Sequence, residues 1–527
     1  MSVGRFALPL RKCEDPDPAI FCPAEGYILP EDCPVPDPEI ICPIDGWVKP
    51  ESPYTPPVET PTPDNEEIIL LCDRSGEGFV SVTGIVTPGK ITYILEDAIT
   101  HVVLNTQELS SYVAFKFDIL TYPDTIFFLV RIKPSSAGST ISRVYTLDES
   151  GYTKDWPIIY ADFTRASNIT SFDSSFKNIL KFKRIDFPSN LDNCTSFRYT
   201  FQNSGLLWVF FPQLPEVTTM YGVCYDCYDL ILAYLPEELP EVTAMTYAFR
   251  NCSSLIEHTM PKKINKCTDI RYYLYGASSL KTLKIWEEAA LLSNIGYAFM
   301  DLVELESWII VKDTPSISSF YNMFYNCTKL PHLEFQVEES IANSCQYIAR
   351  DCDALQYLEL PRSMPNVSSF TGFITAASTG LYRLIMPDEV NYNGMINCTT
   401  ALQTWPLLKQ VEGNMACGPN TYWNFATASA FQGLTSFNKP LAKFDQLYLG
   451  GSLYTTKITY VEVDWTNSPW RDGKCISFGG LLNTTEIDRI FTSLPLVAGT
   501  QEIDVRNNPG YATCDPTIAT VKGWSVL

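Results

Sequence analysis

The sequence predicts a mainly β protein: a parallel β-solenoid, preceded by a small β-rich domain and an extended, proline-rich N-terminal segment. Three observations predict this fold. Between Phe176 and Pro440 the chain repeats itself with a fixed period, residues 66–165 contain short β-rich runs, and residues 1–65 are dense in proline. The period is about 25 residues, and a fixed period of about 20 to 50 residues is typical of a solenoid, in which each unit covers the apolar face of its neighbour.

Composition argues against several classes of partner. The chain has 527 residues and a net charge of −22, whereas nucleic-acid binding needs clustered lysine and arginine. No apolar run reaches the roughly 18 residues that a membrane-spanning helix requires, so we expect no membrane insertion. The first residues contain no apolar core of signal-peptide length, so we expect folding in a cytoplasm without Sec export.

Residues 1–65 are predicted to be an extended anchoring segment and linker. The run Cys13–Cys22 is echoed by the run Cys33–Cys42, and proline at this density favours extended chain. The alternatives for these four cysteines are local disulfides in an oxidising medium or burial against a partner. Residues that suit a partner's groove or sheet edge are Ile20, Phe21, Cys22, Ile40, Ile41, Cys42 and Trp47. The alternative is a flexible stalk without fixed contacts.

Residues 66–165 are predicted to form a β-rich domain. Six β-rich runs are separated by turn residues at intervals of roughly ten, the pattern of a small antiparallel sandwich or of irregular sheet that caps the solenoid. The expected strands are residues 68–71, 79–86, 90–95, 113–117, 125–132 and 141–145.

Residues 166–465 are predicted to be the solenoid. Each unit contains an inner strand of the form apolar-x-x-apolar-x-apolar, often followed by a proline that ends the pairing. Examples are Leu280/Leu283/Ile285, Leu305/Trp308/Ile310, Leu330/Leu333/Phe335 and Leu355/Leu358/Leu360. Because alternate residues of a strand face the same way, the last two positions of each unit should point inward. We therefore expect Leu283, Leu333 and Leu358 to be buried on one continuous parallel sheet.

Residues 466–527 are predicted to be a C-terminal cap that covers the exposed strand edge of the solenoid. Asn483-Thr-Thr-Glu486 has the form of a capping box before a helix. Ile503–Val505 is expected to be the last strand. Asp515 and Pro516 are expected to be the N-cap and first residue of a short helix.

Candidate chemistry is sparse. Cys224-Tyr-Asp-Cys227 is a lone CxxC, which is a weak metal signal. Cys227, Cys252, Cys327 and Cys352 share one repeat position, which indicates core packing. The sequence Asn-Cys-Ser/Thr recurs at Asn193, Asn251, Asn326 and Asn397, and we interpret these asparagines as turn residues rather than glycosylation sites.

No nucleophile–base pair is visible, since the chain has only three histidines. The histidines are His101, His258 and His332. The acidic pairs Glu237-Glu238, Glu287-Glu288 and Glu338-Glu339 are expected to be a solvated loop face rather than glycosidase carboxylates. We therefore predict no enzyme activity, no cofactor and no metal.

The units Asn322–Leu330, Tyr247–Leu255 and Tyr297–Leu305 resemble BspA-like leucine-rich repeats, in the 25-residue variant found in bacterial surface proteins and in phage-encoded proteins. Asn508–Trp524 is similar to the closing segment of such proteins in phages and prophages. The resemblance implies a leucine-rich-repeat solenoid and a role as adhesin or interaction scaffold. Lack of an export signal, a lipobox cysteine and a wall anchor favours a virion protein.

The expected function is that of a non-enzymatic bacteriophage virion protein, such as a head fibre, capsid decoration, collar or tail appendage, assembled in the host cytoplasm. Its N-terminal segment would bind other virion proteins, and its solenoid a host surface glycan or protein. Two alternatives stay open: a bacterial cell-surface adhesin of the BspA-like type, and a polysaccharide-degrading tail protein.

Overall fold

The structure is a computed structural model. Apart from Ala98–Thr100, the residues that the structure describes belong to one compact unit, Thr60–Asp97 with His101–Leu527. The structure describes residues 66–74, 79–87, 89–136, 139–146, 156–166, 168–189, 191–312, 316–367, 374, 380–385, 387, 458–464 and 473–527, together with the backbone of four strands between residues 410 and 449. The predicted anchoring residues of the N-terminal segment lie outside the described residues.

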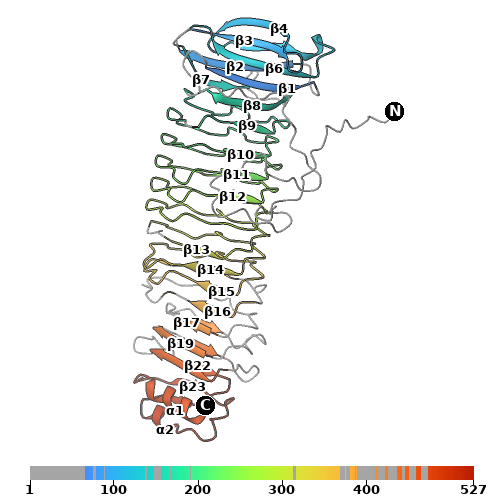
Figure 1. Cartoon of the computed structure of the whole chain (residues 1–527). Helices are drawn as coiled ribbons and strands as arrows, with labels where there is room; N and C mark the ends of the chain where they lie inside the picture. The colour runs from blue at the N-terminus through green and yellow to red at the C-terminus, as the bar shows by residue number, and fades with distance from the viewer. Residues whose placement is uncertain are drawn as a thin grey trace, which may run out of the picture. The chain divides into compact units, whose positions relative to one another are not determined.

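The β-rich domain has two antiparallel sheets (Figure 1). The buried side chains of the two sheets belong to one core. One sheet has the order β4-β3-β6-β1-β8, and the other the order β5-β2-β7. The strands are β1 (Glu67–Asp73), β2 (Phe79–Thr87), β3 (Lys90–Asp97), β4 (Val103–Ser110), β5 (Ala114–Asp118), β6 (Phe127–Pro134), β7 (Thr140–Tyr145) and β8 (Ile158–Arg165), with a short 3-10 helix at Ile119–Thr121. All six expected strands are present. The sequence did not predict β4, a largely exposed polar edge strand, or β8.

Strand β8 joins this domain to the first solenoid turn. It pairs antiparallel with β1 and, on its other side, parallel with β9 (Arg184–Asp186). The core is continuous across this junction, because Phe163 of β8 contacts Phe172 and Phe176 at ring-centroid distances of 5.1 and 6.0 Å. The solenoid therefore begins on a paired strand rather than on an open edge.

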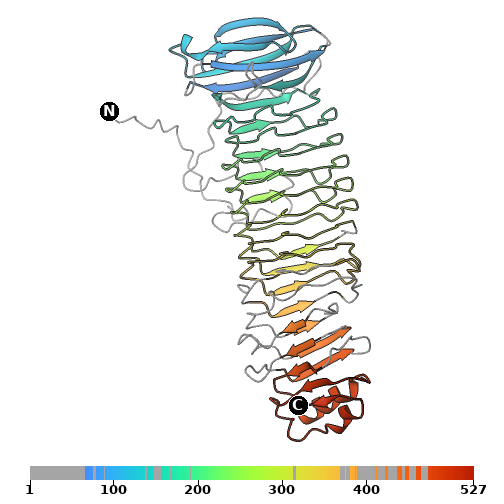
Figure 2. The same ribbon diagram turned by 180° about the vertical axis from the view of Figure 1, so that it is seen from behind.

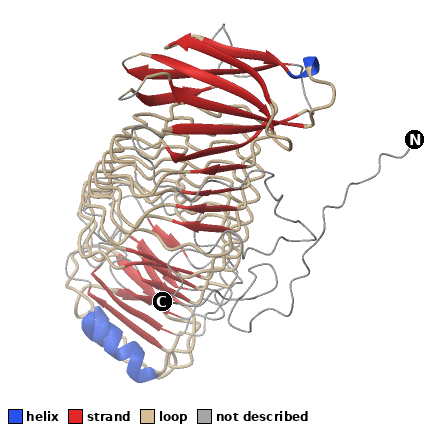
Figure 3. Cartoon of the chain, turned by 45° about the horizontal axis from the view of Figure 1, so that its top comes forward, coloured by secondary structure: helices blue, strands red, loops and turns tan. Residues whose placement is uncertain are grey.

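The solenoid strands are short, parallel and in register, and they follow one another in the order of the chain (Figures 1 and 2). After β9 they are β10 (Trp208–Phe210), β11 (Leu232–Tyr234), β12 (Glu257–Thr259), β13 (Ile309–Val311), β14 (His332–Phe335), β15 (Tyr357–Glu359), β16 (Arg383–Ile385), β17 (Gln410–Glu412), β19 (Ser436–Leu441) and β21 (Tyr460–Asp464). Leu333 pairs with Leu358, and Leu358 with Leu384, all fully buried. Long loops complete each turn (Figure 3). The predicted fold class is confirmed.

The prediction of one continuous sheet is wrong, because the pairing is interrupted between β9 and β10 and again at the turn of Leu283. Leu283 is buried but lies in no strand, so the strands form a three-stranded sheet, β10–β12, and a seven-stranded sheet that begins at β13. The N–H of Leu283 donates to the hydroxyl of Ser307 at 3.1 Å. The side chain of Ser307 thus takes the place of the backbone carbonyl that would continue the hydrogen bonding of the β-sheet.

The predicted inner positions of the next turn are also wrong. Ile309 and Val311 face the core, at 1% and 0% exposure, whereas Trp308 is 70% exposed. Ile309 pairs with Leu333, so the step between these two turns is one residue shorter than the regular repeat. Because side chains alternate across a strand, this shift of one residue exchanges the inward and outward faces.

The repeat cysteines are part of the core, as predicted. Cys227, Cys252, Cys327 and Cys352 are fully buried. Each thiol also donates to a carbonyl of the preceding turn, such as Cys252 to Cys224 at 3.1 Å and Cys327 to Phe299 at 3.2 Å. The cysteine therefore fills space and satisfies a backbone acceptor at the same time.

The C-terminal region adds a second parallel sheet in the order β18-β20-β22-β23-β24. Its elements are β18 (Tyr422–Asn424), β20 (Gln446–Leu449), β22 (Gly473–Phe478), β23 (Gln501–Asp504), β24 (Ser525–Val526) and the helices α1 (Thr484–Ser493) and α2 (Thr517–Thr520). The expected last strand is followed by β24, so that prediction is wrong. Within the described residues, no helix has the length and apolarity needed to cross a bilayer.

The helix starts agree only in part with the predicted caps. The side chain of Asn483 accepts from the N–H of Glu486 at 2.9 Å, as a capping box requires. The reciprocal bond is absent from this described helix start, because the Glu486 carboxylate accepts from the N–H of Val461 at 2.8 Å. In α2, Pro516 is the cap residue and Thr517 the first helical residue, one position later than predicted.

Candidate binding surface

Seven consecutive solenoid turns each place one tyrosine ring beside the ring of the next turn. Neighbouring ring centroids lie between 4.7 Å, for Tyr272 and Tyr297, and 5.9 Å, for Tyr321 and Tyr347. All seven rings are half-buried, so each shows part of its surface to solvent. We call this row the tyrosine ladder: Tyr199, Tyr221, Tyr247, Tyr272, Tyr297, Tyr321 and Tyr347.

The ladder persists although its residues do not all occupy the same repeat position. Five of its tyrosines have a left-handed backbone, for example Tyr247 with φ 59°. A bulky residue pays about 1–2 kcal/mol for that conformation. In the other two turns Gly222 and Asn322 take the left-handed position, with φ 58° and 52°, and the tyrosine comes one residue earlier. The same row of rings is thus built in two ways, and strained residues maintain it.

Arginine side chains contact five of the seven ladder rings and hold them in place. The guanidinium carbon of Arg250 lies 5.0–5.5 Å from the centroids of four rings, those of Tyr225, Tyr247, Tyr272 and Tyr275. Arg198 lies over Tyr199 and Tyr221, and Arg350 over Tyr325 and Tyr347. Cation–π contacts of this kind contribute about 0.5–2 kcal/mol each. At these rings the ladder is therefore a fixed surface that combines aromatic and cationic character.

A row of turn residues lies four or five positions after the ladder tyrosines. Asn251 and Asn326 have φ 59°, and their amides donate to Asp226 and Asp301 of the preceding turn, both at 2.8 Å. Asparagine and aspartate tolerate the left-handed region because their short side chains bond locally. For these two residues the interpretation as turn asparagines is confirmed.

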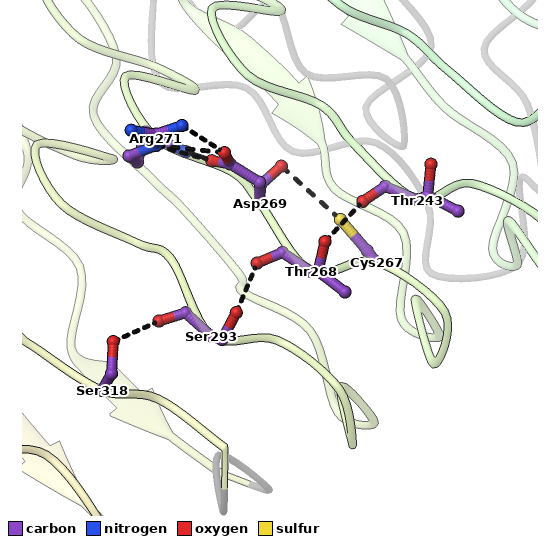
Figure 4. A network of polar contacts seen from close by, with 7 residues as sticks. All are labelled: Thr243, Cys267, Thr268, Asp269, Arg271, Ser293 and Ser318. Carbon is purple, nitrogen blue, oxygen red and sulfur yellow. Dashed lines mark hydrogen bonds and ion pairs between the residues drawn. The ribbon is translucent and has the colours of Figure 1, made fainter.

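A second row consists of hydroxyl side chains that lie three or four residues before each of the first six ladder tyrosines (Figure 4). Each hydroxyl donates to the backbone carbonyl of its counterpart one turn earlier, at 3.1–3.3 Å. The donors are Thr195, Thr218, Thr243, Thr268, Ser293 and Ser318. These hydroxyls link turns and are already engaged, so we assign the row to stability rather than to binding.

The sequence-predicted titratable residues fall into two environments. His258 is buried and bonds to the carbonyl of Ala233 at 3.0 Å and the hydroxyl of Tyr273 at 2.9 Å. Burial lowers the pKa of His258 to about 4, so the ring is neutral at pH 7. His332 instead lies on the outward face of β14, between the rings of Trp308 and Tyr357.

The acidic pairs are exposed, as predicted, and lysines of neighbouring turns lie beside Glu237-Glu238 and Glu287-Glu288. Lys262 pairs with Glu237 at 2.6 Å, and Lys263 with Glu238 at 2.8 Å. Burial raises the pKa of the Cys224 thiol in the CxxC well above its usual value. In the part of the chain that the structure describes, no group of three or more His, Cys, Asp or Glu residues could hold a metal ion.

The anchoring residues predicted in the N-terminal segment lie outside the described residues, and their role stays a prediction. They are Ile20, Phe21, Cys22, Ile40, Ile41, Cys42 and Trp47. Sequence reasoning missed the tyrosine ladder. The signal was present, because Tyr247, Tyr272, Tyr297 and Tyr347 occupy the same position of the repeat.

Comparison with known families matches residues 161–273 and 268–396 to the BspA type leucine rich repeat region, in six copies. These residues run from β8, the last strand of the β-rich domain, to beyond β16 of the solenoid and include the whole tyrosine ladder. No curated protein matches the chain.

Proposed function

We propose that this chain, whose residues 161–396 form a BspA-type leucine-rich repeat region, is a non-enzymatic binding scaffold that presents the tyrosine ladder to a partner. The observation that carries the proposal is the unbroken row of seven half-buried rings. Tyrosine provides a large contact area at low entropic cost, and tyrosine and arginine are enriched at binding hot spots. Fixed rings lose little further freedom when a partner binds.

The state of the titratable groups supports a non-enzymatic role. His258 is neutral and has both ring nitrogens engaged. The acidic residues Glu237 and Glu238 are exposed and ion-paired to lysines, which is the arrangement of a solvated surface rather than of a general acid. Interaction scaffolds need no such chemistry, and the repeat architecture suits them.

We further propose that the chain is carried on a bacteriophage particle, with residues 1–65 as its attachment to capsid, collar or tail proteins. Cys224, Cys227, Cys252 and Cys327 are buried thiols, which are typical of proteins folded in a reducing compartment such as a host cytoplasm. The second candidate is a bacterial cell-surface adhesin, which the BspA-type repeat favours. Mass spectrometry of purified particles and of a cell-surface fraction decides between them by where the chain is enriched.

The binding role is tested with beads that carry the full chain and are incubated with cells of the bacterium that produces it. The double variant Tyr272→Ser/Tyr297→Ser removes two adjacent ladder rings and should lower bead retention by about tenfold, roughly 1.4 kcal/mol. Tyr228→Ser, at an exposed tyrosine outside the ladder, is the matched control and should retain binding. Equal retention by both variants would contradict a role of the ladder.

A further inference from the structure

We propose that the outward face around Trp308, His332 and Tyr357 is a binding site for a neutral saccharide, with the indole of Trp308 as its stacking platform. The inference rests on the proposed binding function and extends it. This face belongs to the strand side of the turns, whereas the ladder tyrosines lie in the loop that precedes each strand.

Three aromatic rings of consecutive turns stack nearly parallel on this face. The centroid of Trp308 lies 4.6 Å from that of His332 at an interplanar angle of 11°, and His332 lies 4.4 Å from Tyr357 at 3°. In the next turn the guanidinium carbon of Arg383 lies 5.5 Å from the Tyr357 centroid. The stack therefore holds the indole in one orientation before any ligand arrives, which lowers the entropic cost of binding.

The other face of the indole is open. Trp308 is 70% exposed, and among the described residues His332 is the one ring that stacks on it. On the far side lies the turn of Leu283, where the sheet is interrupted and Lys284 is exposed. The exposed indole therefore lies beside a break in the sheet. One face of a pyranose carries a row of C–H groups, and this face can stack on the indole ring.

Polar groups that can bond sugar hydroxyls lie on the same face. Glu334 and Glu359 occupy paired positions on β14 and β15, so their backbones are one strand spacing, about 4.8 Å, apart. The Glu334 carboxylate accepts from Gln336 at 2.7 Å and lies 3.0 Å from His332 Nε2. The Glu359 carboxylate accepts from the hydroxyl of Tyr357. These contacts orient acceptors that can each take bidentate bonds from vicinal hydroxyls.

The charge of the site selects the ligand class. Two carboxylates on adjacent strands, in a chain with a net charge of −22, disfavour sialic acids, uronates and phosphorylated polymers, and the neighbouring cations Arg383, Lys284 and Lys312 offset part of this repulsion. The hydroxyl groups of a neutral sugar carry no net charge, and they can donate hydrogen bonds to these carboxylates. The chemistry therefore points to a neutral hexose or pentose oligosaccharide rather than an anionic glycan.

The test uses the full-length chain and an array of neutral β-glucan, mannan and galactan fragments, with uronate polymers for comparison. Quenching or a blue shift of tryptophan fluorescence reports stacking on an indole, and calorimetry gives the affinity. We expect a neutral oligosaccharide to bind the wild-type chain, Trp308→Ala to weaken it by about tenfold or more, and Trp308→Tyr to retain part of the affinity. Glu334→Gln keeps the shape of the side chain and should weaken binding less than Trp308→Ala.

The matched control is Leu496→Ala, which removes another highly exposed apolar side chain. Unchanged thermal unfolding of each variant shows that the solenoid is intact. The proposal is overturned if no neutral fragment binds, if a uronate polymer or a quaternary ammonium ion such as choline binds in its place, or if Trp308→Ala binds as tightly as the wild type. Bead retention of the ladder variant Tyr272→Ser/Tyr297→Ser is scored separately, so failure of the saccharide site and failure of the ladder are distinguishable.

Discussion

The thiol of Cys327 donates a hydrogen bond to the carbonyl oxygen of Phe299 at 3.2 Å, across the boundary between two solenoid turns. Cys352 makes the equivalent bond to Phe324 at 3.1 Å. The repeat cysteine is therefore a link between turns as well as an apolar filler, and this dual role can be measured.

Cys327→Ala should lower the free energy of unfolding by about 1–3 kcal/mol, because it removes buried volume and the hydrogen bond to Phe299. Cys327→Ser keeps a donor at this position and should cost less. Urea titration followed by circular dichroism gives both values. An equal loss for the two variants would show that packing alone accounts for the effect.

Leu333→Ala should lower the free energy of unfolding by about 2–5 kcal/mol through the cavity it leaves between Leu358 and Ile309. Glu338→Ala, at an exposed position, is the control and should change stability by less than about 0.5 kcal/mol. The shift of the first unfolding transition is the measurement. A neutral Leu333→Ala would mean that this leucine is not in the core.

Gly222→Ala should lower the free energy of unfolding by about 1–2 kcal/mol, because Gly222 has φ 58° and an added Cβ would lie 2.7 Å from the Tyr199 ring. Gly296→Ala is the matched control, since its nearest neighbour would be the carbonyl oxygen of Tyr321 at 3.7 Å. Thermal unfolding compares the two. If Gly222→Ala is as stable as Gly296→Ala, the turn does not need glycine there.

His258 should make the solenoid sensitive to acid. Its pKa falls from 6.5 to about 4 on folding, so the unfolded chain binds the proton more readily than the folded chain between these values. Stability is complete above pH 6.5 and should fall by about 3 kcal/mol as the pH drops towards 4. Denaturant midpoints from pH 7.5 to 4.5 test this. His258→Leu should lack the part of the slope that His258 contributes, and an unchanged slope would contradict the assignment.

Part of this fold could be predicted because the repeat forces it. Leu330, Leu333 and Phe335 face the core as expected, since the fixed repeat period and the alternation of a strand place them there. The same pattern failed at Trp308, where two adjacent apolar residues, Trp308 and Ile309, both fit the inner position. Only the pairing of Ile309 with Leu333 decides which one points inward.

The candidate surfaces were harder to predict than the core. Tyr221 and Tyr321 lie one residue out of register with the other ladder tyrosines, so a strict period does not reveal an unbroken row. Their rings join it because the glycine or asparagine that follows takes the left-handed turn. This compensation is a property of backbone geometry, which apolar periodicity does not encode.

At the turn of Leu283, whose N–H donates to Ser307, the sheet of β10–β12 ends and the seven-stranded sheet begins one turn later, while backbone bonds such as Leu274 to Ala298 continue across the loop side. In a solenoid each turn contacts only its neighbours, so the stability of the array depends on the interface between each pair of turns. Where one interface is weaker than the others, the two sides can unfold in separate steps. We expect an unfolding front that enters from either end to pause at this boundary. Under a pulling force, the turns on one side of this boundary would then unfold before those on the other side. The turns that are still folded could continue to hold their ligand.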